Sequence, residues 1–199
     1  MSTTDTDKRS AVDTAVTADT EPRTHAAPDA TAAHVTVATP TGPFTAVVDD
    51  TGAVLASGWT DDAAALLPGV HPTLRPSSSQ WSSELTTVSD AVNAYFAGDL
   101  GAIDSVPVRQ RSGPYVEAVW GALRQIAAGH PLTFATLADA AGHPTAIRAT
   151  AAACARNAVT LFVPCHRVLR QNGTIAGFRY GAALKQWLLT YEDGGTPTY

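Results

Sequence analysis

The spacing of apolar residues changes once along the chain, and this change limits the fold more than any other feature. Residues 34–59 hold short runs rich in β-branched residues, broken by Pro40–Pro43 and by Asp50-Thr51-Gly52. This pattern predicts a small antiparallel sheet with tight turns. In 84–97 and again after Pro114, apolar residues recur every three or four positions, which indicates amphipathic helices. We therefore expect an α+β fold in which a small N-terminal antiparallel-sheet domain precedes a mainly helical C-terminal domain.

Composition and turn residues divide the 199-residue chain into five expected segments. Residues 1–33 consist mostly of Ala, Thr, Asp, Ser, Val and Pro without periodicity, which predicts a disordered tail. The five segments are a tail, an N-terminal domain, a linker, a C-terminal domain and a second short tail: 1–33, 34–100, 101–113, 114–193 and 194–199.

The C-terminal half contains a candidate helix-turn-helix over 136–156. A short helix at Thr136–Ala141 is followed by the break 142–145, and Thr145 is placed to cap a second helix that runs to about Arg156. Two helices across a tight turn with a glycine form this motif, although any pair of adjacent antiparallel helices reads in a similar way.

Three other apolar stretches complete the predicted C-terminal half. One is a helix from Pro114 to about Ile126, and another is a final helix over Ala182–Tyr191. Between them, LFVPCHRVL at 161–169 predicts a buried strand that Pro164 interrupts.

The composition excludes several classes of protein. With 45% hydrophobic residues the chain can bury a core. It holds no apolar run near the roughly 18 residues that a membrane span needs, and its start, MSTTDTDKRS, lacks the apolar stretch of a secretory signal. Cys154 and Cys165 are too few for a disulfide framework. We expect a soluble, cytoplasmic protein without a membrane partner.

The two halves of the chain differ in charge. The net charge is −5, but residues 1–100 carry four basic and thirteen acidic side chains, whereas residues 101–199 carry nine basic and five acidic ones. Eight of those nine bases are arginine, the side chain best suited to phosphate. The second half therefore permits a polyanionic partner that the total charge argues against.

Pro164-Cys165-His166-Arg167 brings a nucleophile, a base and a permanent cation into four residues. A thiol reacts as its thiolate, and neighbouring imidazole and guanidinium groups lower the pKa of a cysteine. Most buried cysteines serve only as small hydrophobic residues, but a core residue is rarely accompanied by a proline and two polar neighbours. Metal binding is a poor alternative because no second pair stands at ligand spacing. We expect no metal, and we expect His34 and His71 to be ordinary histidines.

The segment VPCHRVLRQNGTIAGFRYGAALKQWLLTYE at 163–192 closely resembles the end of the O6-alkylguanine-DNA alkyltransferases, also called methylated-DNA–protein-cysteine methyltransferases. SGPYVEAVWGAL at 112–123 and TFATLADAAGHPTAIRA at 133–149 are similar to two earlier blocks of that family, so the resemblance covers about 35–192. It implies irreversible transfer of the alkyl group from O6-alkylguanine, and as a second substrate O4-alkylthymine, in double-stranded DNA to the protein's own cysteine. It implies no cofactor and no obligate protein partner, and we take a monomer as the default.

The resemblance also implies catalytic roles. Cys165 would attack the alkyl carbon and form a thioether, so that each molecule acts once. His166 would accept the thiol proton, in this family through a bridging water, and Glu192 would orient and balance the imidazole. Without the motif, Glu192 reads as a solvated carboxylate at a helix end. Asn157 resembles the asparagine that braces the reactive turn.

DNA contacts follow from the same resemblance. The lesion must leave the duplex to reach a buried thiol, and Arg148 stands where the family has the arginine that fills the vacated stack. Ala149 belongs to a bare, alanine-rich helix face that can approach a minor groove closely, although such a helix can also simply pack in a core. The remaining implied contacts are Arg156, Arg167 and Arg170 for phosphate, Phe134 for DNA and base, and Val168 and Arg179 for the base.

This chain departs from the family pattern at four positions. Phe134 stands where family members usually have a tyrosine, whose hydroxyl helps the departing guanine, so we expect slower transfer. Ala151 replaces a glycine, and Ala158 and Thr160 replace prolines that follow the asparagine. These changes bear on the geometry of the loop around the lesion and leave the nucleophile intact.

Three other functions remain open at this point. A non-transferring alkyltransferase-like damage sensor is the main alternative, although known sensors replace the cysteine that is kept here as Cys165. A Cys–His hydrolase would turn over and would need an oxyanion hole. A regulator that uses the thiol as a methylation switch would need an extra DNA-binding domain, for which the tail at 1–33 is too short.

Overall fold

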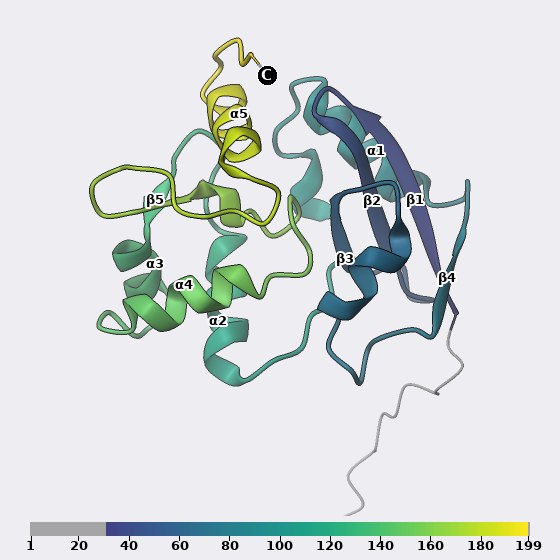
Figure 1. The fold of residues 1–199 in the computed structure, drawn as a ribbon, viewed down its shortest axis with the longest axis horizontal. Helices are drawn as coiled ribbons and strands as arrows, with labels where there is room; N and C mark the ends of the chain where they lie inside the picture. The colour runs from purple at the N-terminus through teal and green to yellow at the C-terminus, as the bar shows by residue number, and fades with distance from the viewer. Residues whose placement is uncertain (1–30, 199) are drawn as a thin grey trace, which may run out of the picture.

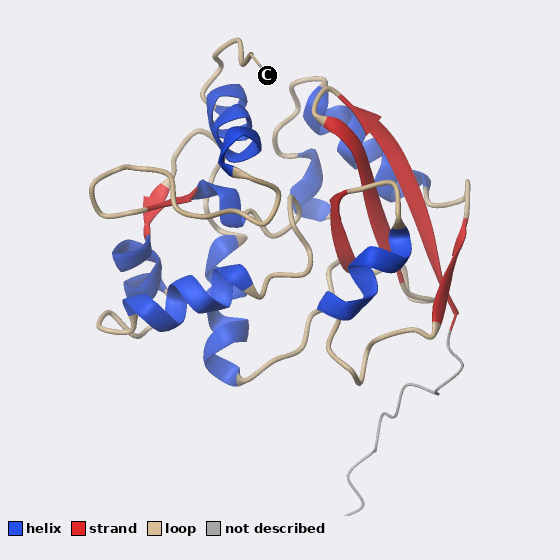
Figure 2. Cartoon of the chain, in the orientation of Figure 1, coloured by secondary structure: helices blue, strands red, loops and turns tan. Residues whose placement is uncertain are grey.

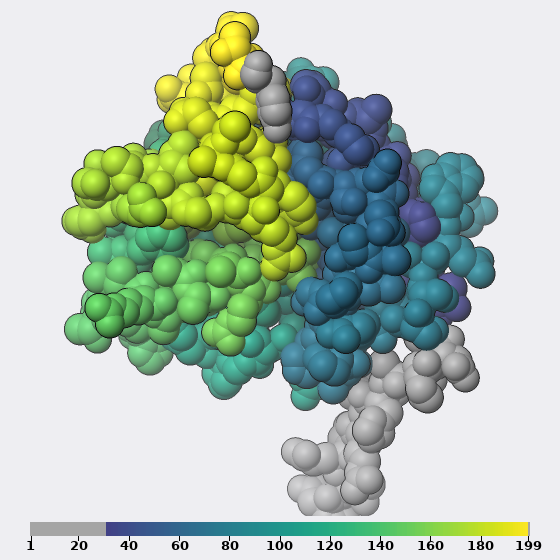
Figure 3. Space-filling view, in the orientation of Figure 1, coloured from purple at the N-terminus to yellow at the C-terminus, as the bar shows by residue number. Residues whose placement is uncertain are grey.

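The structure is a computed structural model that describes residues 31–198. Residues 1–30 of the predicted tail lie outside the described part, whereas Thr31–Ala33, expected in the same tail, are the start of the first strand. A sheet-bearing half and a helical half lie side by side (Figure 1), and Figure 2 shows the longer strands gathered in one of them. The two halves touch along the face seen in the space-filling view (Figure 3). The fold is therefore α+β, as predicted.

The sheet has the strand order β3-β2-β1-β4. β1 (Thr31–Thr39), β2 (Gly42–Val48) and β3 (Val54–Trp59) pair antiparallel through the two turns that the sequence predicts. The first turn places Gly42 at φ +108°, a conformation that glycine adopts without strain. β4 (Ser78–Trp81) pairs in parallel with β1 and was not predicted, because SSQW has neither alternation nor an apolar run.

Both faces of the sheet are covered. α1 (Thr86–Phe96), predicted at 84–97, packs on one face together with the main core. The 3-10 helix η1 (Ala63–Gly69) covers the other face, where Val47 and Leu55 join a smaller cluster. Burial on both sides explains why every residue from Phe44 to Val48 is buried instead of every second one.

The segment expected as a linker, 101–113, is part of the packed structure. It contains η2 (Ala102–Ser105), and Ile103 and Val106 are fully buried. Backbone hydrogen bonds from Val54 N–H to Pro107 O and from Arg109 N–H to Val54 O, both 2.9 Å, pair it with the outer edge of β3. The segment therefore extends the sheet toward the helical half.

The helical half follows the predicted order. Its elements are α2 (Pro114–Leu123), β5 (Leu132–Thr133), α3 (Phe134–Ala140), α4 (Ile147–Ala155), η3 (Cys165–Arg167), β6 (Val168–Leu169) and α5 (Ala182–Glu192). α3 and α4 form the predicted helix-turn-helix, with Gly142 at φ +81° in the turn. The expected cap at Thr145 is wrong, because α4 begins one residue after Ala146 and has no side-chain cap.

The buried strand predicted at 161–169 is also wrong in conformation, although Leu161–Val168 is buried throughout. The chain there forms a turn, then η3, and only the short strand β6. Val163 O accepts from the Asn157 side chain instead of from a neighbouring strand, and Val168–Leu169 pair with β5. Among the described residues, no helix is long and apolar enough to cross a membrane.

Candidate active site

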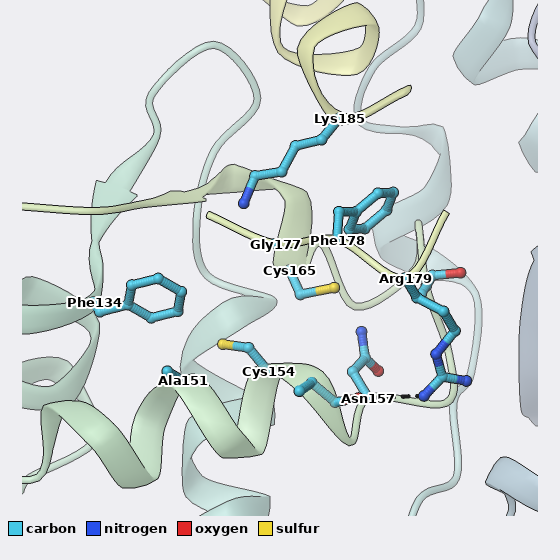
Figure 4. Close-up of a pocket in the computed structure, with 11 residues that line it drawn as sticks. Phe134, Ala151, Cys154, Asn157, Cys165, Gly177, Phe178, Arg179 and Lys185 are labelled. Atoms are coloured by element: carbon cyan, nitrogen blue, oxygen red, sulfur yellow. Dashed lines mark hydrogen bonds between the residues drawn. The ribbon is translucent and has the colours of Figure 1, made fainter. Parts of the chain in front are cut away.

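Cys165 begins η3 and lines a cavity of about 410 Å³. Figure 4 shows Phe134 and Lys185 directed from opposite elements toward the space beside the two cysteine side chains, Cys165 and Cys154. The other residues of the wall are Ala151, Ala155, Asn157, Thr160, Gly177, Phe178 and Arg179. The wall thus contains one buried thiol, a second thiol, two cations and two aromatic rings.

A buried polar cluster adjoins the thiol. His166 donates from Nε2 to Glu192 Oε1 at 2.9 Å, and both side chains are almost completely buried. Arg167 donates from Nε and Nη2 to the same carboxylate at 2.8–3.1 Å, and Tyr95 of α1 donates its hydroxyl at 2.7 Å. His166 Nδ1 has no hydrogen-bond partner among the described residues. Glu192 therefore gathers three partners and leaves one imidazole nitrogen available.

The electrostatics of the cluster favour a neutral imidazole beside an ionised carboxylate. Burial lowers the pKa of His166, against the opposing influence of Glu192. Burial alone would raise the pKa of Glu192, but its interaction with His166 and the hydrogen bonds and charge of Arg167 outweigh burial and hold that pKa at about 2. A neutral imidazole held by a carboxylate can accept a proton, which is the arrangement of a general base.

The Cys165 thiol is protonated at rest. Burial raises its pKa, while hydrogen bonding from Asn157 and the charges of Lys185 and Arg179 act in the opposite direction. Burial likewise raises the pKa of Cys154 to about 12, so that Cys154 is a poor nucleophile. Of the two thiols, Cys165 is the one that its surroundings can activate.

Asn157 holds the loop that precedes Cys165. Its Nδ2 donates to Val163 O at 2.7 Å, and its Oδ1 accepts from Val159 N–H at 3.1 Å. Gln110, from the connecting segment, donates to the same Oδ1 at 3.1 Å and accepts from Ala158 N–H at 2.9 Å. The asparagine is 1% exposed, so these contacts satisfy a buried amide.

The same loop is tied to the sheet by Ser57 of β3. Ser57 Oγ donates to Thr160 O and Thr160 Oγ1 donates to Ser57 O, each at 2.7 Å, and Ser57 N–H donates to Ala158 O at 2.9 Å. Leu161, the residue after Thr160, has φ +73°, which is strained for a bulky residue. The reactive loop is therefore held from the N-terminal half, at the positions where the resemblance expected prolines.

The helix-turn-helix presents an open face of small residues. α2 anchors α4 from behind, because Trp120 Nε1 donates to Ala153 O at 3.0 Å and Tyr115 hydroxyl lies 2.6 Å from Thr150 Oγ1. The predicted DNA contacts Arg148, Ala149, Arg156 and Arg170 are all exposed. Phe134 and Arg179 line the cavity, where the resemblance expects the base.

Two expected contacts are wrong. Arg167 was expected at a phosphate, but it is 2% exposed, and its Nη1 donates to Ile126 O while Nε and Nη2 bind Glu192. Its guanidinium therefore serves inside the fold. Val168 was expected at the base, but it is fully buried outside the cavity wall, and its carbonyl accepts from Lys185 Nζ.

Sequence reasoning missed Lys185, Tyr95, Gln110 and Ser57. For Lys185 a signal existed: it falls on the apolar stripe of α5 with Leu184 and Leu188, and a lysine on a core face usually has a specific partner. The others depend on contacts between distant parts of the chain, and nothing in their local sequence marks them. Within residues 31–198, no group of three or more His, Cys, Asp or Glu side chains could hold a metal.

Comparisons with known proteins agree on one group. A family model described as "6-O-methylguanine DNA methyltransferase, DNA binding domain" matches residues 114–194. Methylated-DNA–protein-cysteine methyltransferases of Shigella flexneri and Salmonella typhimurium are 34% and 35% identical over 158 residues, which cover 78% of this chain and 92% of each relative. A crystal structure of Mycobacterium tuberculosis OGT in complex with DNA superimposes with a TM-score of 0.69 at 27% identity, covering 83% of this chain and 96% of that one.

Proposed function

Because the chain belongs to the methylated-DNA–protein-cysteine methyltransferase family, we propose that it repairs DNA by moving the alkyl group of O6-alkylguanine to its own Cys165. The observation that carries this proposal is the buried Cys165 thiol in a cavity beside the His166–Glu192 pair. The substrate is double-stranded DNA, and the proposed site of action is the cytoplasm, where the bacteria that hold the two relatives named above keep their DNA.

The reaction is a single displacement. Cys165 Sγ forms a bond to the alkyl carbon as the bond between that carbon and guanine O6 breaks. The thiol proton passes to His166, directly or through a water, and Nδ1 is the nitrogen left free to receive it. Glu192 and Arg167 keep the imidazole oriented, and the departing guanine takes up a proton. The product is a thioether that water does not cleave, so one molecule repairs one lesion.

Recognition uses the exposed face of α4. Small side chains at Ala149 and Ala152 allow close approach to a groove and offer few donors to base edges, which suits repair in any sequence context. Arg148 fills the gap that the extruded base leaves, while Arg156 and Arg170 bind phosphate. Asn157, Phe134 and Arg179 surround the base in the cavity.

The decisive experiment is intact mass after incubation with a duplex that carries O6-methylguanine, followed by peptide mapping. The expected result is one methyl group on the Cys165 peptide, saturating at one per protein, and no gain in Cys165→Ala. Cys154→Ala tests the other thiol of the cavity, and we expect it still to gain one methyl group on the Cys165 peptide. Tight lesion binding without mass gain would identify a damage sensor, and release of product beyond one equivalent would identify a hydrolase.

A further inference from the structure

Gln110 connects the two halves of the chain at the reactive loop. It lies in the segment that pairs with the edge of β3, and its half-buried side chain reaches Asn157 and Ala158. These are the two residues that follow the last turn of α4. One side-chain amide thus makes two hydrogen bonds to the start of the loop that leads to Cys165.

The backbone partners show which atom of each amide is the oxygen and which is the nitrogen. Ala158 N–H can only donate, so Gln110 must present Oε1 to it and Nε2 to Asn157. Val159 N–H can only donate and Val163 O can only accept, so Asn157 must present Oδ1 to the first and Nδ2 to the second. The network is therefore fully matched in one orientation, and flipping either amide would set donor against donor or acceptor against acceptor.

The orientation of Asn157 matters for the cavity because this residue forms part of its wall beside Cys165. With Nδ2 held at Val163 O, two residues before the cysteine, the amide edge that carries hydrogen-bond donors faces the thiol side. Hydrogen bonding from Asn157 lowers the pKa of Cys165 against the effect of burial. A rotated asparagine would face the sulfur with its oxygen and would disfavour the thiolate.

We propose that Gln110 is a positioning residue for alkyl transfer, which acts by locking the Asn157 amide so that its donor edge serves Cys165. This inference rests on the proposed function for its kinetic part only. The lock depends on a residue other than proline at 158, since proline has no N–H to give to Gln110. This chain has Ala158, so the glutamine supplies through a side chain the rigidity that a proline ring would supply covalently.

Two variants test the lock, with a third as control. Gln110→Ala removes both hydrogen bonds, and Gln110→Glu keeps the acceptor for Ala158 N–H while it lacks the donor for Asn157. Gln125→Ala removes an exposed glutamine that follows α2 and has no described side-chain hydrogen bond. The kinetic measurement is single-turnover methyl transfer from saturating O6-methylguanine duplex, at a temperature where circular dichroism shows every variant folded.

We expect both Gln110 variants to transfer at least about tenfold more slowly than the unaltered protein, with duplex affinity unchanged. The midpoint of the rate–pH profile moves upward in Gln110→Ala because the thiol loses a donor, and in Gln110→Glu the charge of the added carboxylate acts in the same direction. The other titratable groups around the thiol stay in place: Cys154, His166, Arg179, Tyr180 and Lys185. Gln125→Ala keeps the original rate and profile. A Gln110→Glu protein that transfers at the original rate would overturn the inference, as would an unmoved profile in both variants.

Hydrogen exchange tests the lock without DNA. We expect the Val159 amide, which donates to Asn157, to exchange faster in both Gln110 variants and to be unchanged in Gln125→Ala. Unchanged exchange of the Val159 amide in both variants would overturn the lock, even if the unaltered protein transfers methyl groups as proposed. If the unaltered protein takes up no methyl group but the Val159 amide responds, the proposed function fails and the lock stands.

Discussion

The hydroxyl of Tyr95 donates to Glu192 Oε1 over 2.7 Å, although the two residues are 97 positions apart in the chain. Tyr95 belongs to α1, which packs on the sheet, and Glu192 ends α5. Both are buried, and the same carboxylate oxygen holds His166. The general base is therefore oriented partly by a helix of the N-terminal half, and the geometry of the site depends on how the two halves pack.

Removing the Tyr95 hydroxyl tests whether the site depends on this contact between the two halves. Tyr95→Phe leaves the ring in place and deprives an ionised carboxylate of a buried donor, so we expect a loss of about 1.5–3 kcal/mol in the free energy of unfolding. Transfer also slows, since His166 is held less firmly. Tyr191→Phe is the matched control, because its hydroxyl donates to the neutral Tyr95 O at 2.9 Å in a less buried place. Urea unfolding measures the free energy of unfolding of both variants. Equal losses in the two would contradict a special contribution of the Tyr95 hydroxyl.

The pKa of Glu192 sets the acid limit of stability. It falls from its ordinary 4.5 to about 2 on folding, so the unfolded chain binds the extra proton between these values. Stability is thus fully present above about pH 5 and is lost as pH falls toward 2, by about 3 kcal/mol for this group. When the free energy of unfolding is measured as a function of pH, Glu192→Gln weakens its dependence on pH in this range. Glu84→Gln, at an exposed position, leaves the dependence as steep as in the unaltered protein. An equally steep dependence in Glu192→Gln would refute the assignment of the acid limit to Glu192.

We expect Phe134 to limit the rate of transfer. Its ring lines the cavity but offers no donor to the departing guanine (Figure 4). Phe134→Tyr adds that donor, and we expect single-turnover transfer to rise by roughly tenfold or more. Phe178→Tyr adds the same hydroxyl at another part of the wall and serves as the control. An unchanged rate in Phe134→Tyr would mean that the donor comes from elsewhere.

The reciprocal pair between Ser57 and Thr160 stabilises the strained turn at Leu161. Ser57→Ala leaves Thr160 O without its donor, and Thr160→Val does the same to Ser57 O, so each variant loses about 1–3 kcal/mol in the free energy of unfolding. The exposed Ser105→Ala is expected to change it by less than about 0.5 kcal/mol. Thermal or urea unfolding measures all three, and a loss for Ser57→Ala no larger than the control would refute a stabilising role.

We expect Arg148 to act only when a base must leave a duplex. Arg148→Ala is expected to slow transfer from duplex DNA by roughly tenfold or more, while transfer from the free O6-methylguanine base is unchanged.

We expect the affinity of the unaltered protein for duplex DNA to fall as salt rises, despite the net charge of −5, because the C-terminal half carries eight arginines. Affinity that is independent of salt would exclude this surface as the binding site.

The fold could be predicted where local patterns decide it. The two sheet turns, α1, the helix-turn-helix and α5 follow from turn residues and from helical spacing, and the structure has them within a few residues. β4 and the course of 161–169 could not be predicted, because their conformation depends on partners elsewhere in the chain: β1 for the first, Asn157 and β5 for the second.

The residues of the site also fall into those that the sequence could predict and those that it could not. Cys165, His166 and Glu192 follow from the motif, and the structure brings the histidine and the carboxylate together. Arg167 was misjudged because a charge beside a nucleophile reads as a surface contact, whereas the ion pair with Glu192 exists only after α5 has packed. The contribution of Tyr95 lies in a contact between the two halves that no local pattern encodes.

The pairing of β3 with residues 107–109 and with the loop at Ala158 has a consequence for how such a chain can be cut or recombined. A fragment that begins at Pro114 would carry Cys165 and the helix-turn-helix, yet it would lack Gln110 and Ser57. The remaining half would keep the pairing of Val54 with Pro107 and Arg109 but would lose the contacts of Ser57 with Ala158 and Thr160, so that part of the β3 edge would be free to pair with other chains. The boundary before Pro114 is thus a poor site for joining halves of two different proteins. A chimera that folds needs β3, the segment 101–113 and the loop before Cys165 from the same parent.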